Sequence, residues 1–274
     1  MVDIPTGLQL CRAAGWNQVS SDWELFLKCN PEGARVVVDE QDRIVGTVTT
    51  IRYGGVFGWI GMLLVDPAER RKGLGTKLLV EANTILSGES TIRLDATSAG
   101  REVYRQFGFN DELTIARMQR ASFSGRLDNI ELVSPVGAND MDEIMSWDAR
   151  VFAADRRQLL QLMHGNCPAL TLKIRVDGRI VAYCFGREGY AYLHVGPVVA
   201  TSTRYAVDIV SAMLNLNRDK AILLDVTPQD PQWKAWLNQQ GFSVQREFIR
   251  MYKGIQPPIG VPQEQFAIVG PEFG

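Results

Sequence analysis

A basic, glycine-containing turn follows an apolar run in the first third of the chain. The run at 59–65 passes through Asp66-Pro67 into a cluster of three basic residues and two glycines: Arg70, Arg71, Lys72, Gly73 and Gly75. Apolar residues then recur with helical spacing over 74–86. Glycines at a strand-to-helix turn let backbone N–H groups approach one point, and the helix N-terminus adds partial positive charge. The turn is therefore predicted to bind a phosphate or a pyrophosphate.

Two other phosphate-binding motifs do not fit this turn. The sequence contains no Gly-x4-Gly-Lys-Ser/Thr motif, which excludes the P-loop of nucleoside triphosphatases. The dinucleotide fingerprint needs a third glycine three residues after Gly75, and Leu78 stands there.

Charge and composition exclude several classes of protein. The net charge of −2 gives no general attraction to nucleic acid or to an anionic membrane, so neither is expected as a partner. The four cysteines form no close pair and the chain has two histidines, which favours reduced thiols and gives a metal site little support. The N-terminus lacks the pattern of a signal peptide, and the longest apolar run is too short to span a bilayer. We expect a cytoplasmic protein without a bound metal, of unknown oligomeric state.

The chain repeats itself at an interval of 130 to 136 residues. Five matches occur in the same order: DRIVG at 42–46 with GRIVA at 178–182, IGMLLV at 60–65 with VGPVVA at 195–200, LDAT at 94–97 with LDVT at 224–227, YRQFGF at 104–109 with LNQQGF at 237–242, and Arg117-Met118 with Arg250-Met251. Matches in one order at a nearly constant offset indicate a duplication.

Each copy predicts the same order of elements. Two helices lead to a hairpin, a long strand, a helix, a strand ending in Leu-Asp, a second helix and a closing strand through Arg-Met. The predicted hairpin strands are 34–39 with 44–53, and 169–176 with 179–186. The fold class is α/β, of the α+β kind, in which each copy is a mixed, mostly antiparallel sheet flanked by helices. The predicted domains are 1–124 and 125–253, and 254–274 is predicted to be an extended C-terminal tail.

The two copies differ at their start. The second begins with a strand at 130–135 ahead of a helix at 139–151, and the corresponding strand of the first copy would precede Met1. Because an exposed sheet edge invites aggregation, we expect another segment to cover it. Residues 266–269 of the tail are the predicted segment.

The order of these elements and motifs resembles the GNAT superfamily of acetyl-CoA-dependent N-acetyltransferases. RRKGLG at 70–75 matches the pyrophosphate signature of that family, Gln/Arg-x-x-Gly-x-Gly/Ala. Tyr104 with Gly108-Phe109 matches its helix-then-turn signature. The whole chain is similar to tandem members whose C-terminal half is a degenerate, YitH/HslE-type copy. The resemblance implies tandem GNAT folds.

The resemblance also implies acetyl-CoA as the co-substrate of the first copy. The amides of residues 71–76 would hold its pyrophosphate, and the backbone of residues 63–65 would pair with its pantetheine arm as another strand does. Thr97 stands where the family often has an asparagine that touches pantetheine. The implied cofactor-binding residues are Leu63, Leu64, Val65, Arg70, Arg71, Lys72, Gly73, Leu74, Gly75, Thr76 and Thr97.

Tyr104 and Asp95 are the candidate catalytic residues. By the resemblance, Tyr104 occupies the place of the general acid that protonates the departing thiolate, and its alternative role is packing of a helix against the sheet. The glutamate base that many members carry on the central strand is missing from residues 59–62. Asp95, at the end of its strand, is the nearest candidate for a base, and a buried helix cap is the competing interpretation.

The second copy has lost both signatures. TSTRYAVDIV stands in place of the basic turn, and Leu237 aligns with Tyr104. Arg187 and Asp225 are its candidate substrate-binding residues, because a carboxylate on an otherwise apolar strand needs a partner. A carboxylate-bearing amine would favour Arg187, and a polyamine would favour Asp225.

The leading functional interpretation is an enzyme that acetylates a small primary amine, such as an amino acid or a polyamine, in a pocket shaped by the second copy. An acetyl-CoA sensor without turnover and a protein lysine acetyltransferase are the alternatives. The intact turn and Tyr104 favour catalysis, whereas the missing glutamate favours the sensor.

Overall fold

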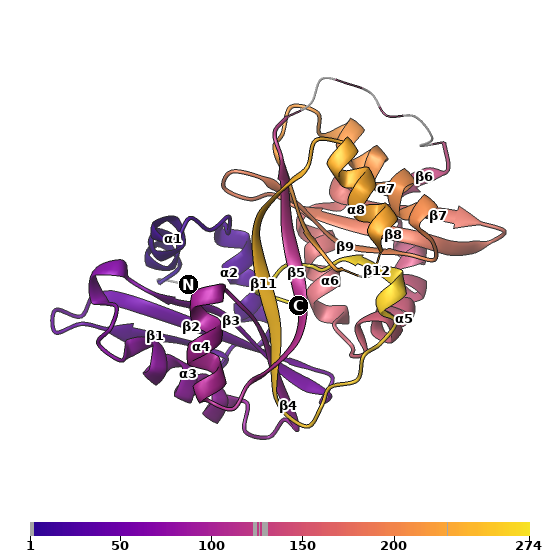
Figure 1. The fold of residues 1–274 in the computed structure, drawn as a ribbon. Helices are drawn as coiled ribbons and strands as arrows, with labels where there is room; N and C mark the ends of the chain where they lie inside the picture. The colour runs from indigo at the N-terminus through magenta and orange to yellow at the C-terminus, as the bar shows by residue number, and fades with distance from the viewer. Residues whose placement is uncertain (1–2, 123–124, 126, 128–130, 229) are drawn as a thin grey trace.

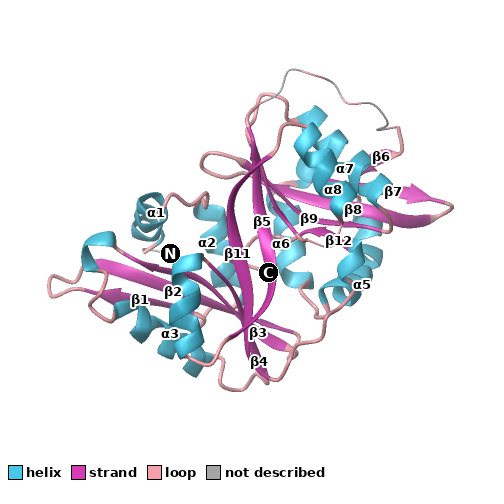
Figure 2. Ribbon diagram, in the orientation of Figure 1, coloured by secondary structure: helices cyan, strands magenta, loops and turns pink. Residues whose placement is uncertain are grey.

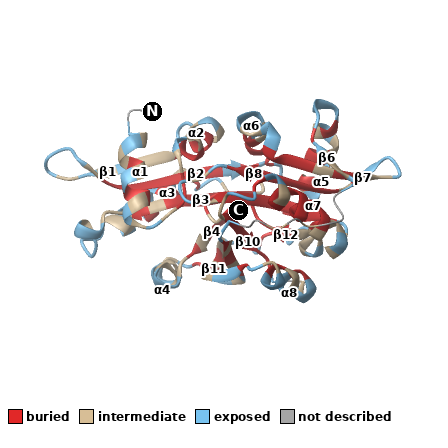
Figure 3. Cartoon of the chain, turned by 90° about the horizontal axis from the view of Figure 1, so that it is seen from above, coloured by how far each residue is buried: buried red, intermediate tan, exposed pale blue. Residues whose placement is uncertain are grey.

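The computed structural model describes residues 3–122, 125, 127, 131–228 and 230–274. In this part of the chain twelve strands form one sheet in the order β1-β2-β3-β4-β11-β5-β10-β12-β9-β8-β7-β6, with helices on both faces (Figures 1 and 2). Figure 3 shows buried residues concentrated in the sheet and on the helix faces turned toward it. No helix of the described chain is long and apolar enough to cross a membrane.

The first copy contains α1 (Ile4–Ala13), α2 (Ser20–Cys29), β1 (Ala34–Val38), β2 (Ile44–Tyr53), β3 (Phe57–Val65), α3 (Leu74–Ile85), β4 (Thr91–Ala96), α4 (Ser98–Gln106) and β5 (Asn110–Arg120). The second contains β6 (Val133–Pro135), α5 (Met141–Phe152), α6 (Arg157–Asn166), β7 (Thr171–Val176), β8 (Arg179–Arg187), β9 (Leu193–Ala200), α7 (Thr203–Leu216), β10 (Ile222–Val226), α8 (Pro231–Gln239) and β11 (Ser243–Gly254). From α1 to β5 and from α5 to β11 the order of helices and strands is the same, which confirms the predicted fold class.

The central strands are buried on both faces. β9 is buried along its whole length, and β2 and β3 are buried at nearly every position. Strands covered on both faces are apolar without alternation, which is the pattern that the sequence shows here. Helix α3 packs Leu78, Leu79 and Ala82 against this layer.

The two copies exchange their closing strands. β11 of the second copy pairs antiparallel with β4 of the first, and β5 of the first pairs antiparallel with β10 of the second. β5 and β11 also pair with each other, so the two long strands run side by side through the middle of the molecule (Figure 1). The predicted boundary between residues 124 and 125 lies beside residues outside those described, and the division into 1–124 and 125–253 stays a prediction about the sequence.

Two buried ion pairs join the copies at this exchange. Arg250 on β11 donates from Nε and Nη2 to the two carboxylate oxygens of Asp95 on β4, at 2.8 and 3.0 Å. Arg117 on β5 donates in the same way to Asp225 on β10, at 2.8 Å for both bonds. These four residues belong to the repeated Leu-Asp and Arg-Met motifs. In each ion pair the arginine comes from one copy and the aspartate from the other.

The tail does not cover the edge of the first copy, and that prediction is wrong. Strand β12 (Gln265–Ala267) pairs with β9 and β10 of the second copy. These two strands pair with each other in parallel at Ile222–Leu193 and Leu223–His194, and β12 enters beyond that point. Residues 266–269 are all buried there, inside the sheet between β9 and β10.

Candidate active site

A gap between β3 and β4 opens the sheet of the first copy. These parallel strands pair at Gly58–Ile92 and Trp59–Arg93, and their register ends there. Just beyond, β3 carries a bulge: its pairing with β2 shifts between Thr47 and Thr49, and Met62 has a positive φ of 50°. A non-glycine residue in this region is strained, and strained residues and bulges cluster at functional sites.

A cavity lies in the gap. Residues 60–63 of β3 form one wall and residues 94, 95 and 97 form the other. The remaining lining comes from five separate segments: Trp16 and Gln18 between α1 and α2, Tyr104 of α4, Arg117 of β5, Phe248 of β11, and Pro271 and Glu272 of the tail. Both copies and the tail therefore contribute to it.

A second cleft adjoins the basic turn. Most of the predicted cofactor-binding residues line it: Leu63, Val65, Arg70, Arg71, Gly73, Leu74, Gly75 and Thr76. Leu64 and Lys72 are not among its lining residues, and Lys72 forms an exposed ion pair with Glu69 at 2.8 Å. Thr97 lines the cavity in the gap instead.

The turn suits a pyrophosphate. Gly73 is the N-cap of α3 with φ of 80°, a conformation that favours glycine, and Arg71 precedes it with φ of 65°. A Cβ atom at Gly73 would meet nothing within 4 Å, so open space adjoins the turn. Since glycine has no side chain to cap the helix, the first N–H groups of α3 are left for a ligand. The chemistry and the space of this turn both fit the pyrophosphate of coenzyme A.

Tyr104 lines both the cleft and the cavity. Thr97 is the N-cap of helix α4, which carries Tyr104, and its Oγ accepts a hydrogen bond from the N–H of Gly100 at 3.2 Å. Burial raises the pKa of Tyr104 to about 12, so the phenol keeps its proton at neutral pH. The side chain thus lies where the two spaces meet, in the protonation state of an acid.

Asp95 lines the cavity and forms an ion pair with Arg250 of the exchanged strand β11. Burial raises its pKa and the adjacent Arg250 opposes that rise. The competing interpretation of Asp95 as a helix cap is wrong, because Thr97 caps α4. Both Asp95 oxygens already accept bonds from Arg250, and its role as a base stays a prediction.

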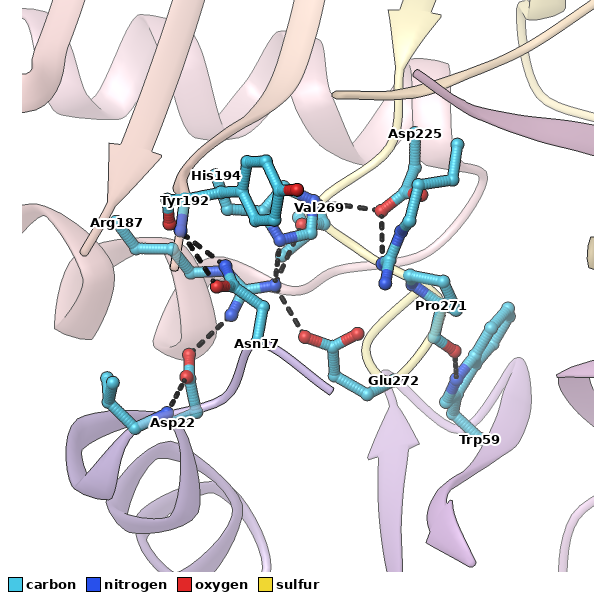
Figure 4. A network of polar contacts seen from close by, with 12 residues as sticks. Asn17, Asp22, Trp59, Arg187, Tyr192, His194, Asp225, Val269, Pro271 and Glu272 are labelled. Atoms are coloured by element: carbon cyan, nitrogen blue, oxygen red, sulfur yellow. Dashed lines mark hydrogen bonds and ion pairs between the residues drawn. The ribbon is translucent and has the colours of Figure 1, made fainter. Parts of the chain in front are cut away.

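Arg187 and Asp225 lie behind the cavity rather than in its wall. Arg187 forms ion pairs with Asp22 and Glu272 and approaches His194 Nδ1 at 2.8 Å (Figure 4). His194 Nε2 lies 2.8 Å from Asp225, which Arg117 also binds. The partners of the two predicted residues, Glu272 and Arg117, are the ones that line the cavity. Internal ion pairs occupy Arg187 and Asp225, and their role in binding a substrate stays a prediction.

The end of the tail brings the residues that sequence reasoning missed. Trp59 Nε1 donates to the Pro271 carbonyl at 3.2 Å, and the Tyr53 hydroxyl donates to the Phe273 carbonyl at 2.6 Å. A Cβ atom at Gly61 would lie 2.4 Å from the Glu272 carbonyl oxygen, so only glycine lets the tail approach β3 this closely. The ring of Phe273 stacks on Phe26 of α2 at 4.4 Å between centroids. These contacts hold Glu272 at the cavity.

The corresponding gap of the second copy is filled by the chain itself. β12 occupies the space between β9 and β10, and a Cβ atom at Gly196 would lie 2.0 Å from the Ile268 carbonyl oxygen. The tail therefore takes the place that the cavity has in the first copy.

Comparisons with known proteins agree with this geometry. Two models described as "Acetyltransferase (GNAT) domain" match residues 31–111 and 144–267. The uncharacterized N-acetyltransferase YitH of Bacillus subtilis is 24% identical over 92% of this chain and 86% of its own. The holothin acyltransferase of a Pseudoalteromonas species is 22% identical over 96% of this chain and 88% of its own.

A solved structure has the same fold over the whole chain. The crystal structure of a putative acetyltransferase from Pyrococcus horikoshii superposes with a TM-score of 0.82 at 21% identity, covering 100% of this chain and 93% of that one. The two family models together span most of the sequence, one on each copy. The chain therefore belongs to the GNAT acyltransferases and carries two GNAT domains in tandem.

Proposed function

We propose that the protein transfers an acetyl group from acetyl-CoA to a small primary amine that binds in the cavity between the two copies. The observation that carries this proposal is the position of Tyr104, where the cleft of the pyrophosphate turn meets the cavity. A cofactor seated on the turn and running along residues 63–65 would bring its thioester to the gap beside Met62. The acceptor would then reach the thioester from the side of the second copy and the tail.

Acetyl-CoA supplies the activated acetyl group, and the chain supplies position and a proton. As the free amine attacks, a C–N bond forms and the C–S bond breaks. Tyr104 gives its phenolic proton to the sulfur, and the proton that the new amide nitrogen loses restores the phenol. Burial keeps the phenol protonated until it is needed, which suits the role of general acid.

A small acceptor agrees better with the cavity than a protein lysine does. Residues of both copies and of the tail line the cavity, so it is covered on several sides. A site lined in this way suits a ligand that is mostly buried and is less suited to a bulky acceptor. The names of the relatives specify acyl transfer, and in one case holothin as that protein's acceptor.

A turnover assay tests the proposed function. The purified protein is mixed with acetyl-CoA and a panel of amino acids, polyamines and arylalkyl amines, and release of the free thiol is followed. Acceptor-dependent release supports the proposal. Tight binding of acetyl-CoA without release for any amine would favour the sensor and overturn it.

We expect one acetyl-CoA to bind per chain, at the turn of the first copy. The second copy has TSTRYAVDIV at this place, without a glycine, and β12 occupies its gap. Gly73→Val should abolish binding, because a β-branched residue is strained at φ of 80°. A change in the corresponding segment of the second copy, Arg204→Ala, should leave affinity unchanged. Calorimetry that gives two sites per chain would contradict this expectation.

A further inference from the structure

Two polar residues that line the cavity, Gln18 and Glu272, have no role in the proposed acetyl transfer. Gln18 is 3% exposed and lines the cavity, and its Oε1 atom has no hydrogen-bond partner within the described chain. Glu272, 4% exposed, lines the same cavity from the tail. A buried acceptor atom without a donor costs free energy, and a ligand that donates a hydrogen bond would remove that cost.

Glu272 belongs to a buried cluster that has more carboxyl groups than cationic side chains. The cluster, drawn in part in Figure 4, contains three carboxylates, two guanidiniums and one imidazole: Asp22, Asp225, Glu272, Arg117, Arg187 and His194. Burial and the neighbouring Arg187 lower the pKa of His194, so the imidazole is neutral at neutral pH. One carboxylate therefore exceeds the number of cations.

Glu272 keeps its charge in this cluster. Burial opposes its ionisation, but the charges of Arg187 and Arg117 outweigh burial and hold its pKa below the ordinary value. Burial instead raises the pKa of Asp22, on the far side of Arg187. Of these two carboxylates, the one whose ionisation its neighbours favour belongs to Glu272, which lines the cavity.

We propose that Gln18 and Glu272 together bind the amino group of the acceptor, so that the enzyme prefers amines that are cationic in solution. An ammonium has three donors and no acceptor, which suits an amide oxygen and a carboxylate. The bound ammonium must lose one proton to solvent before its nitrogen can attack, and the same pair then stabilises the positive charge that develops again on the nitrogen during attack. This inference rests on the proposed function, since it assigns the acceptor class of that site.

The test compares two acceptors of similar size and different charge. Benzylamine is cationic at neutral pH and aniline is neutral. Glu272→Gln keeps the shape of the side chain and removes its charge, so it should raise the KM for benzylamine about tenfold or more and leave the KM for aniline within about twofold. Gln18→Met, which removes the amide oxygen at similar volume, should raise the KM for benzylamine several-fold.

Asp22→Asn is the matched control. Asp22 binds the same Arg187 from the side away from the cavity, and it is not among the lining residues. If the Glu272 variant acts only by weakening the cluster, the Asp22 variant should have the same effect on KM. Equal effects of the two variants, or an unchanged KM for benzylamine in Glu272→Gln, would overturn the inference. A wild-type enzyme that acetylates no amine would instead overturn the proposed function, and this inference with it.

Discussion

Tyr104→Phe should lower kcat by a factor of about 10² to 10⁴, the usual contribution of a positioned general acid. The substitution removes one oxygen and keeps the ring that packs near Phe109, at 6.0 Å between centroids. Acetyl-CoA affinity should stay near the wild-type value, because the pyrophosphate turn does not depend on the phenol. The loss therefore falls on the chemical step alone.

Thiol release at saturating acetyl-CoA measures kcat, and calorimetry measures the affinity for acetyl-CoA. Tyr252→Phe, on β11 and outside both spaces, is the matched control and should leave kcat unchanged. If Tyr104→Phe turns over at the wild-type rate, the acid role is wrong and Tyr104 is a packing residue, which is its alternative interpretation.

The sequence predicted the elements well because local signals specify them. The apolar run before Asp66-Pro67 became β3, and the helical spacing from Leu74 became α3. The glycines of the turn predicted a backbone conformation that Gly73 indeed adopts. The duplication also predicted that the same elements would occur twice.

Strand exchange could not be predicted from the repeat. Each closing strand carries one of the repeated arginines. That arginine can pair with the aspartate of its own copy or with the aspartate of the other copy, and the sequence is compatible with both arrangements. The choice depends on how the connections cross in space, and no local signal reports it. The pairs Arg117–Asp225 and Arg250–Asp95 became visible only with the pairing of β5 and β11.

The site residues that lie close together in the sequence were predicted, and those that come from distant segments were missed. Residues 63–76 contain both the strand and the turn, so their neighbourhood follows from the chain order. Gln18 and Glu272 are 254 positions apart in the sequence, and both line the cavity. Glu272 lies there because the tail passes between β9 and β10 of the second copy and then contacts β3. Composition gave no sign of that path. Asp225 and Arg187 attracted attention as polar outliers, yet their partners were the residues at the cavity.

Arg250→Met should destabilise the protein by about 3 to 5 kcal/mol, the usual cost of removing one partner from a buried ion pair. Arg250 and Asp95 have side chains 3% and 0% exposed, so water cannot replace the lost guanidinium. The cost is mostly that of the charge left on Asp95. Adding Asp95→Leu removes this charge and should recover most of the stability, because two apolar groups in a buried site often match an ion pair.

Chemical denaturation of the wild type, both single variants and the double variant measures this coupling. Arg246→Met, on the same strand and half-buried, is the control and should cost much less. Because Arg250 belongs to the second copy and Asp95 to the first, a large coupling would show that the exchanged strands hold the copies together as one folding unit. If the double variant instead loses as much stability as the two single variants together, the coupling is absent and this expectation is contradicted. The cross-copy pair would then contribute little beyond packing.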